Sequence, residues 1–184
     1  MSDPAFFGYG SLVNTATHSY ADPRPATLTG WRRVWQRTNL RKAAYLSVIP
    51  DATCALQGLI ARVPGANWQA LDLREAAYER HDISHLIAHD GLRAPTAVYQ
   101  VRMDHLTGTT DHPILLSYLD VVVQGYFRVY GIVGVSLFFE TTHGWDLPIL
   151  DDRADPVYPR HQRLTAQECA LVDEHLAAVM QKAE

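Results

Sequence analysis

Cysteine is scarce in this sequence, which has two cysteines in 184 residues. Cys54 and Cys169 lie far apart and do not form a CxxC motif. This spacing is typical neither of a disulfide-rich scaffold nor of a zinc ribbon, so we expect two free thiols in a reducing compartment. The first residues also lack a basic region followed by a long apolar run, so no signal peptide is predicted. The expected localisation is therefore cytoplasmic.

The sequence also lacks an excess of positive charge. Sixteen Lys and Arg stand against twenty Asp and Glu, which gives a net charge of -4. With no basic stripe, we expect no nucleic acid as a partner. The longest apolar-rich stretch, between residues 114 and 139, is interrupted by Asp120, Gln124 and Arg128. It is a poor membrane span, so we expect no membrane partner either. The sequence carries no signal for an oligomeric state.

The apolar content that is present suffices for one core. Hydrophobic residues make up 47% of the chain and charged residues 20%, which is typical of a globular domain. The chain shows no internal repeat, low-complexity segment or long linker. We therefore expect a single domain over residues 1–184, in which residues 131–184 are a C-terminal extension that ends in a helix.

Short runs of β-branched and aromatic residues between turn residues predict strands in the first half of the chain. These strands are expected at 5–9, 27–35, 44–49, 55–63, 78–83 and 97–103. Helical spacing of apolar residues predicts helices at 67–75, from Pro113 onward, and at 165–180, where Thr165 and Glu168 form a capping box. Residues 137–145 are ambiguous, and 146–163 are expected to be extended over the surface. Strands followed by helices indicate an α+β fold with a curled, largely antiparallel sheet or a small mixed β-barrel flanked by helices.

The first segment that suggests chemistry is Tyr9-Gly10-Ser11-Leu12, at the end of the first predicted strand. We expect Gly10 to adopt a backbone conformation that is costly for other residues. The turn would then expose backbone amides as a nest for a carboxylate or a developing oxyanion. The same residues are also typical of an ordinary glycine turn after a strand.

Two further segments each have a functional and a structural interpretation. Glu75 closes the sequence Leu-Asp-Leu-Arg-Glu at the end of a predicted helix, from which it can point into the mouth of the sheet. It can equally be a solvated residue paired with Arg74 or Arg80. Tyr118, followed seven residues later by Gly125, lies on the apolar face of a predicted helix. It can line a pocket or belong to the core.

Taken together, these segments resemble the γ-glutamylcyclotransferase family. Its members have a YGS-type loop after the first strand, then an LDxxE motif, then a short strand that starts near a tyrosine, here Tyr78. Some members also have a tyrosine followed seven residues later by a glycine. The stretch Gly30-Trp31-Arg32-Arg33 resembles a pattern in the glutathione-degrading branch. Position 12 departs from one branch, which has Asn, and Ala76-Ala77 replaces a glycine that often follows the glutamate.

The resemblance implies an enzyme that converts a small γ-glutamyl substrate to 5-oxoproline and a free amine, without a metal or cofactor. It implies Glu75 as the catalytic residue. The substrate-binding residues that it implies are Tyr9, Gly10, Ser11, Leu12 and Tyr118. The segment beyond about residue 131 resembles a bacterial extension, whose Tyr158 and Arg160 either reach the pocket or belong to a surface tail.

Other functions remain open. His81, His85 and His89 are spaced i, i+4 and i+8, so on a helix they would share a face and could bind zinc, although no HExxH motif is present. A non-catalytic binding module on the same fold is another possibility, because a fold does not fix a function. A nucleophilic role for Cys54 is a further alternative, with no recognisable partner.

Overall fold

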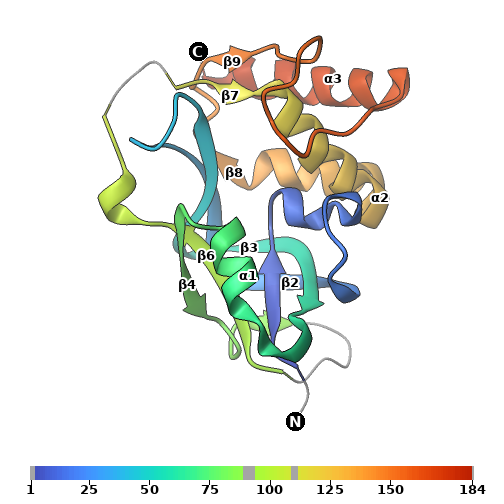
Figure 1. Cartoon of the computed structure of the whole chain (residues 1–184). Coiled ribbons are helices and arrows are strands. Elements are labelled where there is room, and N and C mark those ends of the chain that lie inside the picture. The colour runs from blue at the N-terminus through green and yellow to red at the C-terminus, as the bar shows by residue number, and fades with distance from the viewer. Residues whose placement is uncertain (1–2, 89–93, 109–111, 184) are drawn as a thin grey trace.

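The computed structural model describes residues 3–88, 94–108 and 112–183. Within these ranges a curled sheet of seven strands has the order β4-β6-β1-β3-β2-β5, with β8 paired to β2 (Figure 1). The strands are β1 Ala5–Gly8, β2 Ala21–Arg37, β3 Ala44–Arg62, β4 Tyr78–Asp82, β5 Ile87–Ala88, β6 Thr96–Val101 and β8 Thr142–His143. The pairs β1–β6 and β2–β8 are parallel and the others antiparallel. The predicted α+β fold with a curled mixed sheet is confirmed.

The helices lie around this sheet. They are α1 Trp68–Arg74, α2 Leu116–Glu140 and α3 Ala166–Ala183, with the 3-10 turns η1 Ser11–Val13, η2 Thr15–Thr17, η3 Pro64–Ala66 and η4 Met103–His105. A separate parallel pair, β7 Ile114–Leu115 and β9 Ile149–Leu150, connects the start of α2 to the C-terminal part of the chain. Figure 1 shows α2 and α3 together on one side of the molecule and α1 beside β4 and β6.

The strands β2 and β3 form one long antiparallel hairpin. Thr29 pairs with Ala55 and Trp31 pairs with Pro50, so β3 contains extra residues between these two pairs. Gly30 has a φ of 79° at the same point of β2, a conformation that favours glycine. The prediction of two separate strands at 44–49 and 55–63 is therefore wrong. The turn residues between them form an irregularity inside a single strand, and such irregularities bend a sheet.

The helix α2 supplies much of the core. Leu119, Val122 and Tyr126 are completely buried on the face that was predicted from their spacing. At Gly131 the φ of 66° departs from helical geometry, and the chain changes direction there before it continues to β8 (Figure 1). Glycine tolerates this conformation, which a side chain would disfavour. Residue 131, where the C-terminal extension was expected to begin, therefore lies at a break within α2.

By length and apolar composition alone, α2 would be able to cross a membrane. The core helix of a globular protein passes the same test, and 50% of the most apolar window of α2 is buried within the chain. Two of its buried residues are also polar. Asp120 pairs with Arg153 at 2.8 Å, and the Gln124 side chain accepts a hydrogen bond from Asn14 at 3.0 Å. Packing within the chain therefore accounts for the composition of α2.

The helix α3 begins with the predicted capping box. The Thr165 amide donates to Glu168 Oε2 at 2.7 Å, and the Glu168 amide donates to Thr165 Oγ1 at 3.2 Å. The two side chains thus satisfy each other's backbone amides at the helix start. Val172 and Leu176 are buried, and the His175 Nε2 lies 3.1 Å from the hydroxyl of Ser136 in α2. The prediction of a terminal helix is confirmed, and α3 packs on α2.

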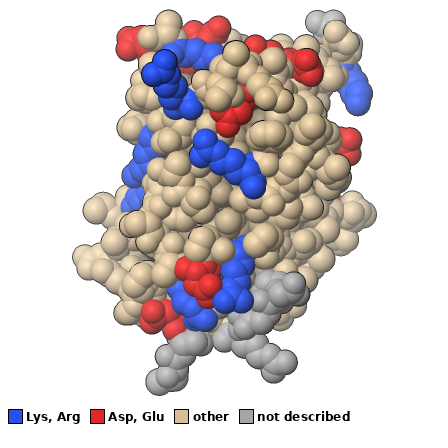
Figure 2. Space-filling view, turned by 90° about the vertical axis from the view of Figure 1, so that its right-hand side faces the viewer, with Lys and Arg blue, Asp and Glu red and all other residues tan. Residues whose placement is uncertain are grey.

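Charged side chains do not form a single stripe on the face shown in Figure 2. Basic and acidic side chains are interspersed near its upper and lower ends, and much of the surface between them is uncharged. Several charged residues of the chain are paired with one another, for example Asp22 with Arg24 at 2.9 Å and with Arg62 at 3.3 Å. The absence of a nucleic acid partner stays a prediction.

Candidate functional site

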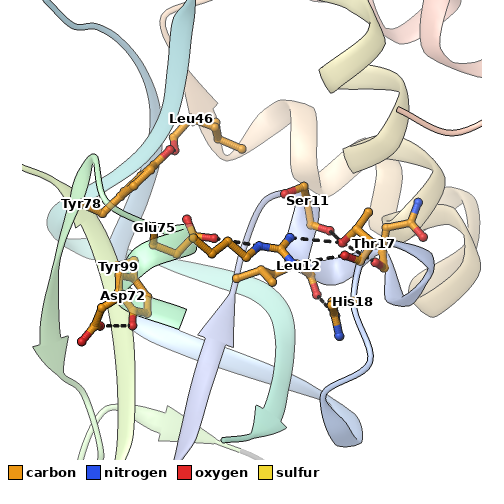
Figure 3. Close-up of polar contacts among 11 residues, drawn as sticks. Ser11, Leu12, Thr17, His18, Leu46, Asp72, Glu75, Tyr78 and Tyr99 are labelled. Atoms are coloured by element: carbon orange, nitrogen blue, oxygen red, sulfur yellow. Dashed lines mark hydrogen bonds and ion pairs between the residues drawn. The ribbon is translucent and has the colours of Figure 1, made fainter. Parts of the chain in front are cut away.

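Glu75 is the residue at which α1 ends. Its amide donates to the Leu71 carbonyl at 2.9 Å, and its own carbonyl accepts from the Tyr78 amide at 2.8 Å, so a tight turn joins α1 to β4. Figure 3 shows the carboxylate pointing toward the loop that carries Ser11 and Leu12. The side chain is 17% exposed. The carboxylate is therefore largely shielded from solvent, although it is paired with Arg74 as one alternative expected.

The surroundings of Glu75 change its acidity. Burial raises its pKa above the ordinary value, while the charges of Arg74 and Arg160 and a hydrogen bond from Arg74 act in the opposite direction. Arg74 Nε lies 3.1 Å from Glu75 Oε1, and another nitrogen of the same guanidinium donates to the Thr17 carbonyl at 3.1 Å (Figure 3). A carboxyl group whose pKa moves toward neutrality is suited to accept and return a proton.

The loop between β1 and η1 lies beside Glu75. Gly10 has a φ of -121° and a ψ of -129°, and the expectation of a conformation costly for other residues stays a prediction. Space gives a second reason for the glycine, because a Cβ at this position would lie 2.7 Å from the Tyr118 hydroxyl oxygen. The backbone of Ser11 also forms a hydrogen bond with that hydroxyl, which partly offsets the rise in its pKa. The binding of an anion by this loop stays a prediction.

Tyr9 follows β1 and lines the smaller pocket, and its role in substrate binding stays a prediction. Its hydroxyl donates to the Tyr99 carbonyl in β6 at 2.6 Å, and only 6% of the residue is exposed. Its carbonyl accepts a hydrogen bond from the Tyr126 hydroxyl at 3.0 Å. The side chain of Tyr9 therefore holds the sheet together beside the pocket, and its hydroxyl is already engaged.

Tyr118 lies in the first turn of α2 among other aromatic rings. Its ring meets those of Trp35 and Tyr158 edge-on, at centroid distances of 5.8 and 4.9 Å. Burial, then the neighbouring Tyr158 and Glu75, raise the pKa of Tyr118 far above its ordinary value. The hydroxyl therefore keeps its proton at neutral pH and can donate a hydrogen bond to a ligand.

Gly125 allows α2 to approach closely the turn η1, whose C-terminal cap is Asn14. A Cβ at this position would lie 2.7 Å from the Asn14 amide nitrogen and 2.9 Å from its Cα. The Asn14 side chain also donates to the Val121 carbonyl at 3.0 Å. The glycine seven residues after Tyr118 thus allows the end of η1 to pack directly on α2.

The predicted site residues come together in space. Two adjoining pockets share Ser11, Leu46, Glu75, Tyr78 and Tyr118, and the smaller one is also lined by Tyr9, Gly10 and Leu12. The larger pocket contains about 610 Å³ of space, its open mouth included. The Tyr9–Leu12 loop, the end of α1 and the start of α2 are distant in the sequence, and together they line one site.

The mouth of the larger pocket is lined by residues outside the predicted site. Arg41 comes from the connection between β2 and β3, and Tyr158 and Arg160 come from the segment between β9 and α3. Of the two alternatives for Tyr158 and Arg160, the structure supports a place at the pocket. For Arg41 the sequence gives no signal, because an arginine beside a turn is usually only a solvated residue.

Asp152 attaches this C-terminal segment to the start of α2. Its Oδ1 accepts from the Ser117 amide at 2.7 Å, and its Oδ2 accepts from the Ser117 hydroxyl at 2.6 Å and from the Val157 amide at 2.9 Å. The Tyr158 amide donates to the same Ser117 hydroxyl at 3.3 Å. Since Ser117 precedes Tyr118, one buried carboxylate sets the positions of Tyr118 and Tyr158 together.

We expect Asp152→Asn to destabilise the protein by about 1–3 kcal/mol at pH 7, because a buried, charge-assisted acceptor is lost. Burial alone would raise the pKa of Asp152, but hydrogen bonds from Ser117 and Val157 lower it below the ordinary value. This carboxylate therefore stabilises the fold above the unfolded pKa of about 3.9 and ceases to do so as the pH falls through the lower folded value.

Urea unfolding of wild type and Asp152→Asn at several pH values tests this expectation. The difference between the two proteins should be largest near neutrality and should shrink in acid. Asp155→Asn is a matched control, because Asp155 is an exposed carboxylate of the same segment. An equal loss in both variants would contradict the role given to Asp152.

The histidines do not have the arrangement that the zinc alternative requires. His81 lies on strand β4 with its Nε2 3.2 Å from Glu79, and His85 is exposed in the turn that follows. The helix on which their spacing would align them is therefore absent at these positions, and His89 lies outside the described residues. Neither His81 nor His85 lines either pocket, and the described residues contain no group of three or more His, Cys, Asp or Glu placed for a metal.

Two other sequence features lie away from the pockets. Cys54 is buried in β3 and lines neither of them. In the stretch that begins at Gly30, Arg33 is fully buried, and its guanidinium carbon lies 5.1 Å from the ring centre of Tyr126 and 5.0 Å from that of Phe138. This stretch therefore belongs to β2 and to the core.

Comparisons with known proteins agree with the arrangement described above. A family model described as ChaC-like protein matches residues 5–114. Among solved structures, a γ-glutamyl cyclotransferase is 12% identical with a TM-score of 0.62, over 95% of this chain and 99% of that chain. An uncharacterized protein from Homo sapiens is 13% identical with a TM-score of 0.62, over 94% of this chain and 99% of its own.

YkqA from Bacillus subtilis is 17% identical with a TM-score of 0.55, over 70% of this chain and 49% of YkqA, so the chain spans about half the length of that protein. Curated protein sequences gave no match. At these identities the solved structures establish a shared fold, and the family match covers the strands β1 to β6 and Glu75.

Proposed function

Since this chain belongs to the ChaC-like family and has the γ-glutamylcyclotransferase fold, we propose that it converts a γ-glutamyl amino acid, amine or peptide to 5-oxoproline and the free amine. The observation that carries the proposal is the position of Glu75. It is a shielded carboxylate with a raised pKa, at the base of a pocket that the Tyr9–Leu12 loop and Tyr118 also line. A carboxylate that served only solubility would lie in bulk water.

The reaction needs two proton transfers at neighbouring nitrogens. The α-amine of the glutamyl group attacks its own γ-carbonyl carbon, a new C–N bond closes the ring, and the original amide C–N bond breaks. An α-amine has a pKa near about 8 and is mostly protonated at neutral pH. The ammonium would first lose one proton to water, and the neutral amine would then attack. Glu75 would take the second proton from this nitrogen and give it to the leaving nitrogen, so that the carboxylate is regenerated.

The rest of the pocket would hold the glutamyl group in the folded conformation from which the ring closes. The Tyr118 hydroxyl and the backbone amides of Gly10 and Leu12 are donors suited to the substrate carboxylate or to the developing oxyanion, while the Ser11 amide already donates to Tyr118. Well-oriented intramolecular reactions reach effective molarities of about 10⁵ M or more, so positioning supplies much of the rate. These steps are proton transfers and acyl transfer, and they require no redox cofactor.

The proposal is tested by incubating the full chain with a panel of γ-glutamyl compounds and measuring 5-oxoproline. The panel contains glutathione, γ-glutamyl dipeptides and γ-glutamylamines, because all of them carry the reacting half. We expect 5-oxoproline from at least one compound, and none from the matching α-glutamyl dipeptide, whose carbonyl is in the wrong place for the five-membered ring. If no compound yields 5-oxoproline while one of them still binds, the chain is a binding module on this fold.

A further inference from the structure

Two exposed arginines line the larger pocket. Arg41 lies in the connection between β2 and β3, where its guanidinium stacks 5.0 Å from the ring centre of Tyr45. Arg160 lies on the segment that Asp152 attaches to α2. Both residues are exposed, whereas the Glu75 side chain is mostly shielded. Among the described residues, the exposed part of the pocket lining therefore carries positive charge, and Glu75 is its one carboxylate.

The guanidinium of Arg160 acts on the inside of the pocket. Its charge lowers the pKa of Glu75 and also that of Tyr20, against the larger effect of burial on each. Within the described part of the chain, Arg160 forms no ion pair, whereas Arg74 is paired with Glu75 at 3.1 Å. Arg41 also has no acidic partner among the described residues, but its guanidinium is engaged with the ring and the hydroxyl of Tyr45. Arg160 is therefore the cation of this pocket that is most free to pair with an anionic group of a ligand.

The segment that carries Arg160 is held in place before any ligand arrives. The Val157 amide is bound by Asp152 and the Tyr158 amide by Ser117, at 2.9 and 3.3 Å. The Tyr158 ring also packs edge-on against Tyr118. A backbone that is already ordered reduces the entropy cost of binding. The position of Arg160 at the mouth is therefore built into the fold.

The direction of the substrate follows from the chemistry at Glu75. The amine and the γ-carbonyl must both lie within reach of that carboxylate, so the glutamyl half occupies the base of the pocket. The leaving half then extends toward the mouth. A positively charged mouth favours a leaving half that ends in a carboxylate over one that is neutral.

We propose that Arg160 is a specificity-determining residue that binds a carboxylate on the leaving half, so that γ-glutamyl amino acids and peptides are preferred over γ-glutamylamines. This inference rests on the proposed function of the same pocket. Because the guanidinium is exposed and screened by salt, its contribution is modest, and we expect a preference of about tenfold in kcat/KM.

The sharpest test compares γ-glutamylalanine with γ-glutamylethylamine, which differ only in the carboxylate of the leaving half. Wild type should prefer γ-glutamylalanine about tenfold, and 0.5 M NaCl should reduce that preference because salt screens the charge. Arg160→Gln should raise KM for γ-glutamylalanine about tenfold and leave γ-glutamylethylamine nearly unchanged. Arg160→Lys, which keeps the charge, should retain part of the preference.

Arg163→Gln is the matched control. Arg163 is an exposed arginine of the same segment that does not line the pocket, so this variant should behave as wild type with both substrates. If Arg160 acts only through its charge on Glu75, Arg160→Gln will change both substrates equally and shift the pH profile of kcat. That result overturns the inference, as does an unchanged preference in Arg160→Gln. If wild type produces 5-oxoproline from neither compound nor from any member of the wider panel, the proposed function itself fails.

Discussion

Glu75→Gln is expected to fold normally and to lose about 10²–10⁴-fold in kcat, the usual cost of removing a general acid/base. Glutamine has the same shape and can still accept the hydrogen bond that Arg74 donates, but it cannot carry a proton between two nitrogens. Turnover of the best γ-glutamyl substrate, measured as 5-oxoproline, gives the size of the loss. Near wild-type turnover in a folded variant would contradict the assignment.

The stability of the same variant provides an independent check of the environment of Glu75. The folded pKa is raised by burial, so the folded state favours the protonated form. Any stabilisation from this group is complete below the unfolded pKa of about 4.3 and is lost as the pH rises through the higher folded value. Glu75→Gln should therefore be at least as stable as wild type at neutral pH, and this advantage should shrink below pH 4.

Glu79→Gln is the matched control for the loss of turnover. Glu79 is an exposed glutamate four residues further along the chain, on β4, and it lines neither pocket. We expect this variant to keep wild-type turnover. A loss of activity in both variants would indicate a general effect of charge around α1 and β4, and would count against a specific role for Glu75.

Gly125→Ala is expected to destabilise the protein by about 1–3 kcal/mol and to lower its activity, because an added methyl overpacks a tight contact. The new Cβ would lie 2.7 Å from the backbone nitrogen of Asn14 and 2.9 Å from its Cα. A backbone cannot move aside as the end of a flexible side chain can. Relief would require η1 to shift away from α2, which would displace the Ser11 side of the pocket.

Urea unfolding and steady-state kinetics measure the two effects of Gly125→Ala separately. Gly108→Ala is a suitable control, because a Cβ at Gly108 would meet nothing within 4 Å. If Gly125→Ala unfolds at the same urea concentration as wild type, the contact between Gly125 and Asn14 is not as rigid as the structure indicates.

Local patterns predicted the elements that depend on neighbouring residues. The capping box at Thr165 and Glu168 and the end of α1 near Glu75 both follow from a few adjacent positions, and both are confirmed. The merging of two predicted strands into β3 does not follow in this way. Turn residues after Ile49 look alike whether they end a strand or bulge within one, and only the pairing with β2 decides between these outcomes.

In the site, too, some features follow from local sequence motifs and others depend on contacts between distant segments. Glu75 and Tyr118 were identified through the family resemblance, whereas the spatial reason for Gly10 lies in a hydroxyl more than a hundred residues away in the sequence. Arg41 has no local signal, because the fold of the whole sheet brings it to the pocket that Glu75 and Arg160 also line. Contacts between distant segments depend on the whole sheet, and a single sequence does not encode them as a pattern.

The parallel pairing of β1 with β6 has a consequence for how the protein is made. Phe6 pairs with Ala97, and the strands between them in the chain complete the sheet on both sides. Contacts of such long sequence separation must wait for loop closure, so folding on a scale of milliseconds to seconds is expected rather than microseconds. During synthesis β1 must therefore remain unpaired on the side that β6 will occupy until β6 has emerged. The part of the pocket that carries Arg160 forms later still. A ribosome-bound chain that ends near residue 150 would already contain Glu75 and Tyr118 but not the wall that carries Arg160.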